Sequence, residues 1–119
     1  MIPMVLFGVT VVPPQAWPEL RANVNDHEEV LCNPRTAFFT VQPYVWDAVV
    51  AKKMRDIRAG RFVRVSGVYR NGRRWVFDGH HTLAAYRILG EDFFPCTFYG
   101  PGSERISAPK LQPFRRRAA

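Results

Sequence analysis

The alternation of apolar and polar positions along this chain of 119 residues predicts a mixture of strands and helices. An apolar run at about 4–12 and another at 94–99 are typical of strands, and residues 37–41 are expected to form a short extended segment. Asn71-Gly72 separates two further apolar stretches. Because both residues tolerate a positive φ, this pair predicts a hairpin over about 62–77.

Two helices are expected, over about 44–59 and 80–89. Apolar and long side chains recur at helical spacing in the first, and Gly60 is placed to end it, as Gly90 is for the second. The expected stripe of the first helix, with Trp46 interpreted as part of the core, contains Trp46, Val49, Val50, Lys53, Met54 and Ile57.

The connecting segments are expected to be irregular. Prolines at 13, 14 and 18 favour an irregular stretch or a short helix near 17–24, and residues 25–29 have the composition of a polar loop. Asn33-Pro34-Arg35 predicts a turn. The resulting fold class is a small α+β domain over residues 1–100, followed by a basic, flexible C-terminal tail over 101–119.

Composition supports one small globular domain, since 47% of the residues are hydrophobic. It excludes a large multidomain enzyme and a fully disordered chain. No apolar run reaches the roughly 18 residues that span a bilayer, and the start has no basic signal region. We therefore expect a cytoplasmic protein of a bacterial or phage-infected cell. Cys32 and Cys96 belong to no Cys-x-x-Cys motif and are expected to be reduced, buried thiols.

Charge is distributed unevenly along the chain. Residues 1–50 contain two Arg and five acidic residues, a balance of −3, whereas residues 51–119 contain 15 basic and five acidic residues, a balance of +10. Of the 17 basic residues, 14 are Arg, which favours bidentate contact with phosphate or carboxylate. A polyanionic partner is one interpretation; the other is the Arg-rich codon usage of a GC-rich genome, with no ligand involved.

The segment with the clearest chemical pattern is Asp78-Gly79-His80-His81-Thr82. A predicted strand leads into Asp78-Gly79, and a helix then begins whose first amides have no intrahelical partner. Such a helix start attracts anions through its free N–H groups and its dipole. In the alternative structural interpretation, Asp78 caps the helix, Gly79 makes a tight turn and the histidines are ordinary exposed residues. Adjacent histidines on a helix point about 100° apart, so they do not converge on one metal ion.

The run from Phe77 to Tyr86, with Leu89-Gly90 and Pro95 after it, resembles the phosphate-binding motif of the ParB/sulfiredoxin superfamily in its DGHHR variant. Upstream, Gln42-Pro43-Tyr44-Val45 before a helix, and then a hairpin, are similar to the ParB-like N-terminal domain, which is often catalogued as "ParB-like nuclease". The resemblance covers about residues 36–99. It implies a ParB/sulfiredoxin-like fold whose glycine-led helix start binds a nucleotide, with ATP or CTP and Mg²⁺ as the implied cofactors.

Two departures from the family pattern narrow what the resemblance implies. His80 stands where sulfiredoxins carry their nucleophilic cysteine, so reductase chemistry of that type is not expected. Thr82 stands where other members carry arginine, which removes a fixed charge from the implied phosphate site. Arg87, one turn further along the helix, faces away from the helix start and does not replace it.

The first functional hypothesis is a small phage or bacterial module that binds nucleotide phosphate or nucleic acid. The phosphate site would be formed by Asp78, Gly79, His80, His81 and Thr82, with Asp78 holding Mg²⁺ on a bound nucleotide. The nucleic-acid surface would contain the basic residues of the second half: Lys52, Lys53, Arg55, Arg58, Arg61, Arg64, Arg115, Arg116 and Arg117. The alternative is that these basic side chains form a solvated surface.

Two other hypotheses remain. In the second, the protein is a phosphotransferase, NTPase or nuclease in which Asp78, His80 and His81 are catalytic. A second carboxylate would then be needed, and Glu28, Glu29 and Asp47 are candidates by elimination. In the third, a non-catalytic phage protein binds a host protein through an exposed aromatic patch. The residues of that patch would be Trp17, Phe38, Phe39, Tyr44 and Trp46.

Overall fold

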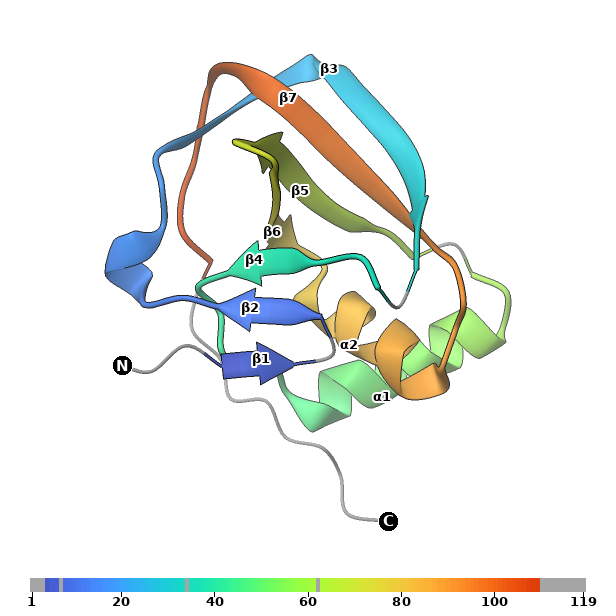
Figure 1. The fold of residues 1–119 in the computed structure, drawn as a ribbon. Coiled ribbons are helices and arrows are strands. Elements are labelled where there is room, and N and C mark those ends of the chain that lie inside the picture. The colour runs from blue at the N-terminus through green and yellow to red at the C-terminus, as the bar shows by residue number, and fades with distance from the viewer. Residues whose placement is uncertain (1–3, 7, 34, 62, 110–119) are drawn as a thin grey trace.

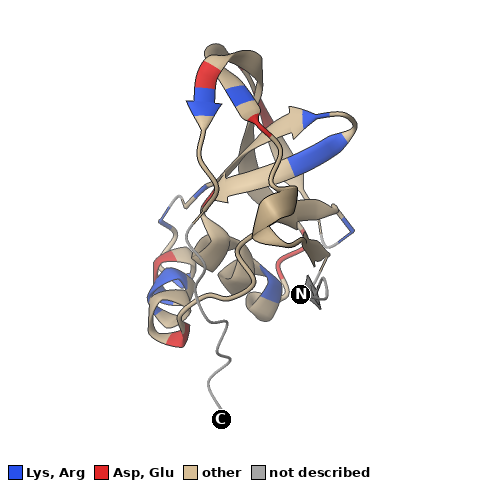
Figure 2. Ribbon diagram, turned by 90° about the vertical axis from the view of Figure 1, so that its left-hand side faces the viewer, with Lys and Arg blue, Asp and Glu red and all other residues tan. Residues whose placement is uncertain are grey.

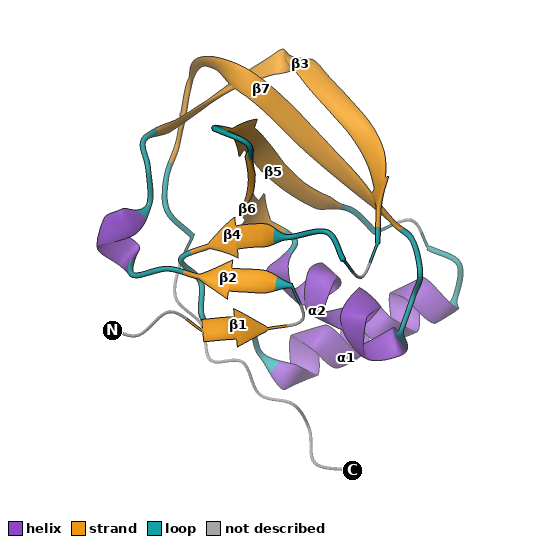
Figure 3. Ribbon diagram, viewed as in Figure 1, coloured by secondary structure: helices purple, strands orange, loops and turns teal. Residues whose placement is uncertain are grey.

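The computed structural model describes residues 4–6, 8–33, 35–61 and 63–109 (Figure 1). In these residues, seven strands form one mixed sheet in the order β1-β2-β4-β6-β5-β7-β3, accompanied by two α-helices and one short 3-10 helix (Figure 3). The expected α+β class is confirmed. The elements are β1 (Met4–Leu6), β2 (Val9–Val11), η1 (Pro14–Ala16), β3 (Leu20–Cys32), β4 (Phe38–Thr40), α1 (Asp47–Arg58), β5 (Val65–Arg70), β6 (Arg73–Asp78), α2 (His80–Leu89) and β7 (Phe94–Ile106).

The sheet combines parallel and antiparallel pairs. Strand β4 lies between β2 and β6 and is parallel to both, whereas β5 is antiparallel to β6 and parallel to β7. The short β1 and the long β3 form the two edges of this order. Helices α1 and α2 pack against each other (Figure 1). Among the described residues, neither α-helix is long and apolar enough to span a membrane.

The core follows the alternation of side chains along the strands. Phe38 and Phe98 pack with Leu83 of α2 on one face of the sheet, and their neighbours Phe39 and Tyr99 belong to a second cluster on the other face. The second cluster is closed by the segment after η1. Trp17 meets Trp75 edge-on there, with ring centroids 5.6 Å apart, and also packs near Leu20 and Ala22.

The hairpin and the second helix confirm the sequence prediction. Asn71 and Gly72 have φ angles of 53° and 73°, so both residues of the two-residue turn adopt the left-handed conformation. Helix α2 spans the predicted residues, and Gly90, with a φ of 70°, ends it. Cys32 and Cys96 are buried free thiols, as expected.

One prediction for the N-terminal part is wrong, and another is decided between its alternatives. The run expected to be one strand at 4–12 forms the antiparallel pair β1 and β2, because Gly8 turns the chain between them with a φ of 81°. Of the irregular stretch and the short helix predicted near 17–24, the helix does not form, and the irregular stretch around η1 ends at residue 19. Trp17 is extended after η1, and β3 begins at Leu20, which pairs with Ile106 at the far end of β7.

The predicted loop at 25–29 is also wrong, because these residues lie within β3. His27, Glu28 and Glu29 pair with β7, after an irregular register that begins at Asn23. Residues 23–29 are all exposed, so they carry the polar composition of a loop while forming an edge strand. Strand β7 correspondingly continues to Ile106 instead of ending at 99, through residues expected to belong to the tail. Arg115–Arg117 lie outside the described residues.

Helix α1 begins at Asp47, three residues later than expected. The residues from 42 to 46 have no regular secondary structure, and Trp46 is 42% exposed, so the interpretation of Trp46 as a core residue is wrong. Val50 is the fully buried position of the predicted stripe, and it packs with Ala85 of α2. The expected end of the helix is confirmed, since Gly60 follows it with a φ of 77°.

Candidate functional site

The start of α2 is uncapped. Strand β6 ends at the exposed Asp78, and Gly79 is the N-cap residue, which has no side-chain hydrogen bond to the helix. Asp78 is therefore not the N-cap, and that structural interpretation is wrong. The Leu83 N–H is the first to reach the helical acceptor Gly79, at 2.8 Å, so the amides of residues 80–82 precede the hydrogen-bonded turn. The positive end of the helix dipole coincides with these amides.

Position 79 requires glycine because another segment of the same chain passes close to it. Its φ is 87°, and a Cβ atom there would lie 2.8 Å from the Arg64 carbonyl oxygen and 3.0 Å from the Val65 Cα. The missing side chain thus makes room for the segment that enters β5. This close contact holds the start of α2 against β5, and it accounts for the glycine without a ligand.

His80 is a buried link between α2 and the end of β4. Its Nε2 lies 2.7 Å from Thr40 Oγ1, and the same oxygen accepts a 3.1 Å hydrogen bond from the Gln42 amide. The His80 side chain is 9% exposed. Burial, followed by the nearby His81, lowers the pKa of His80 to about 4. The ring is therefore neutral at pH 7 and is engaged inside the protein.

His81 binds the segment that precedes α1. Its Nε2 accepts a 3.1 Å hydrogen bond from the Trp46 amide, so the neutral ring carries its proton on Nδ1. Partial burial, followed by the positive charge of Lys53, lowers the pKa of His81. Lys53 belongs to α1, which packs against α2. Of the predicted basic set, it is the residue whose charge acts on His81.

The other predicted members of the phosphate site differ in exposure. Thr82 is 2% exposed, so its side chain belongs to the interior, whereas Asp78 is exposed. Within the described residues, no group of three or more His, Cys, Asp or Glu side chains is arranged to hold a metal ion. Asp78 is thus an exposed carboxylate beside the helix start that could contact a metal ion only together with ligands from elsewhere.

Most of the predicted basic residues lie away from the helix start. Lys52, Arg55 and Arg58 are exposed on α1. Arg61 forms a 2.6 Å ion pair with Asp56. Arg64 pairs with Glu29 and also donates to Thr97 Oγ1 at 2.7 Å, so its side chain points to the β3–β7 edge.

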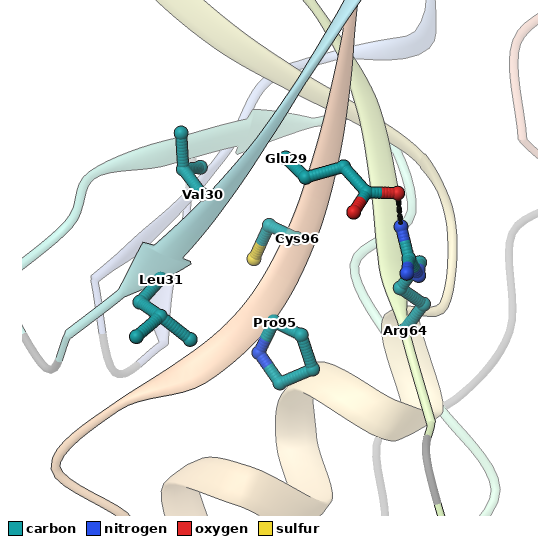
Figure 4. A pocket seen from close by; sticks show the side chains of 6 residues that line it. All are labelled: Glu29, Val30, Leu31, Arg64, Pro95 and Cys96. Atoms are coloured by element: carbon teal, nitrogen blue, oxygen red, sulfur yellow. Dashed lines mark hydrogen bonds and ion pairs between the residues drawn. The ribbon is translucent and has the colours of Figure 1, made fainter.

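That edge contains a cleft of about 200 Å³, which Figure 4 shows from close by. The Arg64–Glu29 pair lies on one side of it, and the side chains of Val30, Leu31, Pro95 and Cys96 line the rest. Glu29, one of the carboxylates considered by elimination, is therefore held on β3 by Arg64. The pKa of this carboxyl is lowered by its hydrogen bond from Arg64 and by the charge of that side chain.

The predicted aromatic patch separates into two groups. Phe38 is buried, and Trp17 and Phe39 pack against the second core cluster. Tyr44 and Trp46 are 44% and 42% exposed on the segment before α1. Only these two could contribute to an exposed patch, and they lie on the segment that His81 binds.

Sequence reasoning missed Thr40 as part of this arrangement. Thr40 ends β4 and is fully buried, and its hydroxyl connects the backbone of Gln42 to His80. A threonine two residues before Gln42-Pro43 gives a weak local signal. Threonine hydroxyls commonly accept a hydrogen bond from the backbone amide two residues later in a turn. That spacing does not reveal that the same hydroxyl also contacts a histidine on α2.

Comparisons of this chain with protein-family models, with curated proteins and with solved structures find no match. The site is therefore interpreted from its geometry.

Proposed function

We propose that this protein has a ParB/sulfiredoxin-like fold and binds the phosphate groups of a nucleotide at the start of α2. The observation that carries the proposal is the uncapped start of α2, where the amides of residues 80–82 precede the first helical hydrogen bond. Three amides at the positive end of the dipole favour an anion, and so does the positive charge of Lys53 on the packed helix α1. The element order from β4 through α1 and the hairpin to α2 also agrees with the resemblance in the sequence.

His81 contributes a third feature that favours phosphate. Because its Nε2 accepts from Trp46, the proton on Nδ1 is available for donation to an oxygen of the ligand. His80 has a different role in this proposal. It stays neutral and holds β4 against α2, which positions the amides for the ligand.

Asp78 supplies the only exposed acidic group of the predicted site motif. Next to a phosphate it is repulsive unless a divalent cation lies between the two groups. The proposal therefore assigns Asp78 to Mg²⁺ that arrives with the nucleotide. We propose binding instead of turnover because His80, a candidate acid or base, is buried, neutral and hydrogen-bonded to Thr40.

A thermal-shift experiment tests this function. The protein is heated with ATP, ADP, CTP or GTP, each with and without Mg²⁺. A nucleotide at 100 times its dissociation constant stabilises the folded state by about 2.7 kcal/mol, which raises Tm by several degrees in a domain of this size. The expected result is stabilisation by at least one nucleotide, and the absence of a shift with all four would disprove the proposal.

Two lysine variants provide the matched comparison. Lys53→Gln removes the charge that acts on His81 and is expected to abolish most of the shift. Lys52→Gln removes the same charge from the neighbouring exposed position and is expected to keep it. Equal loss in both variants would mean that overall charge, and not this site, attracts the nucleotide. Asp78→Asn is expected to remove the effect of Mg²⁺ while leaving the metal-free shift in place.

A further inference from the structure

The turn of the β5–β6 hairpin carries three arginines. Arg70 ends β5, and Arg73 and Arg74 begin β6, on either side of Asn71-Gly72. The sequence from 57 to 77 contains no acidic residue. In Figure 2, the blue segments at this turn lie at the free end of the hairpin, which projects from the side of the ribbon.

The end of the hairpin extends beyond its neighbouring strands. The pairing of β5 with β7 reaches Val68, and the pairing of β6 with β4 is at Trp75. Residues 69–74 therefore form a two-stranded ribbon paired only with itself among the described residues. A two-stranded ribbon has the width that the major groove of a DNA duplex accommodates.

The arginines of this ribbon have no carboxylate partner among the described residues. Arg70 and Arg73 are directly opposite each other in the register, which places like charges side by side at a cost in stability. Arg70 donates to the Glu19 carbonyl oxygen, and the Glu19 carboxylate is itself paired with Arg21 at 3.0 Å. A bound anion would offset this repulsion.

Two of the guanidinium groups are held in place by aromatic rings. Arg73 lies over the Phe39 ring, 4.6 Å from its centroid. Arg74 lies on the other face of the hairpin, over the Tyr69 ring at 5.3 Å and the Phe98 ring at 5.5 Å. These contacts restrict the side chains without neutralising them. Positive charges that are already positioned lose less entropy when they bind an anion than freely moving side chains do.

Arg70 and Arg73 also line a pocket of about 380 Å³ between the hairpin and the segment around η1. Arg70, Asn71 and Arg73 line it on the hairpin side, with Trp75 beneath, and Ala16 and Pro18 close the other side. Its volume falls at the lower end of the range for ligand sites. Its donors are two guanidinium groups and an amide, a set that matches phosphate oxygens.

We propose that the β5–β6 turn is a nucleic-acid contact in which Arg70 and Arg73, which share one face of the hairpin, bind the phosphodiester backbone. This surface is separate from the proposed nucleotide site. Arg73 begins β6 and Asp78 ends it, so the two lie about 16 Å apart at a rise of about 3.3 Å per residue. The contact differs as well from the basic surface that the sequence predicted on α1 and in the tail.

The test measures the binding of a labelled oligonucleotide of 20 nucleotides, as a single strand and as a duplex, by fluorescence anisotropy between 50 and 200 mM NaCl. Arg70→Gln/Arg73→Gln is expected to weaken binding about tenfold at the middle of this range. For the duplex, it is expected to reduce the slope of log K against log salt by about 1.8, since each lost phosphate contact contributes about 0.9. Comparison of the two affinities shows whether the turn prefers a single strand or a duplex.

Charge-matched variants make the result specific. Arg35→Gln/Arg105→Gln removes two exposed positive charges elsewhere and is expected to change the affinity less than twofold. Lys52→Gln/Arg55→Gln tests the surface on α1. An equal or larger loss from either control pair would overturn the proposal, and so would competition by polyglutamate as effective as that by unlabelled oligonucleotide.

A second measurement needs no variant. Titration of the isotope-labelled protein with the oligonucleotide is expected to shift the amide resonances of residues 69–75, together with the indole of Trp75. Shifts confined to α1 or to the start of α2 would contradict the proposal. The nucleotide thermal shift does not involve the hairpin, so failure of the nucleotide site and failure of the nucleic-acid contact are distinguished by separate readouts.

Discussion

Thr40 Oγ1 and His80 Nε2, 2.7 Å apart, join the end of β4 to the first residue of α2 inside the protein. Next to this contact, His81 accepts a hydrogen bond from the Trp46 amide, 3.1 Å away. The two adjacent histidines therefore hold the segment from Thr40 to Trp46 against the start of α2 at both of its ends. This arrangement fixes α1 as well, because the helix begins immediately after Trp46.

The hydrogen bond between Thr40 and His80 is expected to stabilise the fold. Thr40→Val keeps the shape of the side chain but leaves the His80 ring nitrogen and the Gln42 amide without this partner. The expected loss is about 1–3 kcal/mol in the free energy of unfolding, measured by urea denaturation. Thr10→Val on the neighbouring β2 is the control, because no hydrogen bond of the Thr10 side chain is seen among the described residues. Equal losses in the two variants would contradict the assigned role.

The low pKa of His80 predicts a loss of stability in acid. The folded-state pKa is about 4, below the ordinary value of 6.5, so the stabilisation is fully present above pH 6.5 and is lost as the pH falls toward 4. From the linkage relation, the free energy of unfolding is expected to decrease by about 2 kcal/mol between pH 7 and pH 5. Urea denaturation across this range measures the decrease.

Two histidine variants test the origin of this pH dependence. His80→Gln is expected to remove most of the decrease, whatever its effect on stability at pH 7. His27→Gln changes an exposed histidine on β3 and is expected to preserve the decrease. If the pH dependence of His80→Gln equalled that of the wild type, the ionisation of this buried ring would not be its source.

The parts of the fold that were predicted correctly depend on local signals. Asn71-Gly72 determines the hairpin because both residues adopt positive φ, and Gly90 ends α2 for the same reason. The identity of β3 depends on a distant partner instead. Leu20 pairs with Ile106 and Glu29 with Thr97, and the exposed residues between them have the composition of a loop. No local pattern specifies that pairing.

The candidate site was predictable in position but not in detail. The motif Asp78–Thr82 does form a helix start, as the sequence indicated. The sequence did not reveal that His80 is directed inward to Thr40, since the two residues lie forty positions apart. Nor did it reveal that Arg64, near the motif in space, is directed away from it by Glu29. Both outcomes depend on how distant segments pack.

The interior position of Arg87 predicts that lysine cannot replace it. Its two terminal nitrogens donate to the carbonyl oxygens of Asn33 and Thr36 at 3.1 and 3.0 Å, and its guanidinium lies 5.2 Å from the Phe94 ring centroid. The side chain thus points away from the start of α2, as expected, and it holds the turn before β4. Burial lowers the pKa of Arg87.

Arg87→Lys is expected to lower the free energy of unfolding by about 1–3 kcal/mol, because one ammonium group does not reproduce the planar fork that reaches both carbonyls. Chemical denaturation measures the change. Arg58→Lys, an exposed substitution of the same type on α1, is expected to stay within about 0.5 kcal/mol of the wild type. A similar small change in Arg87→Lys would show that the carbonyl contacts do not stabilise the turn.

Gly79 and Gly90 form a matched pair at the two ends of α2. Both have positive φ, 87° and 70°, but a Cβ at Gly79 would lie 2.8 Å from the Arg64 carbonyl oxygen, whereas a Cβ at Gly90 meets nothing within 4 Å. Gly90→Ala therefore tests backbone strain alone, with an expected loss of about 1–2 kcal/mol. Gly79→Ala adds the collision with the segment entering β5, and its expected loss is larger by about 1–3 kcal/mol.

Thermal and urea denaturation of the two alanine variants measures this difference. The same collision means that a larger residue such as glutamate at position 79 would disturb β5, and it could not serve to block the proposed phosphate site selectively. If Gly79→Ala were no less stable than Gly90→Ala, the backbone of Arg64 and Val65 would have to move without cost. The start of α2 would then be separable from β5, and the amides proposed to bind phosphate would not be held in a fixed position.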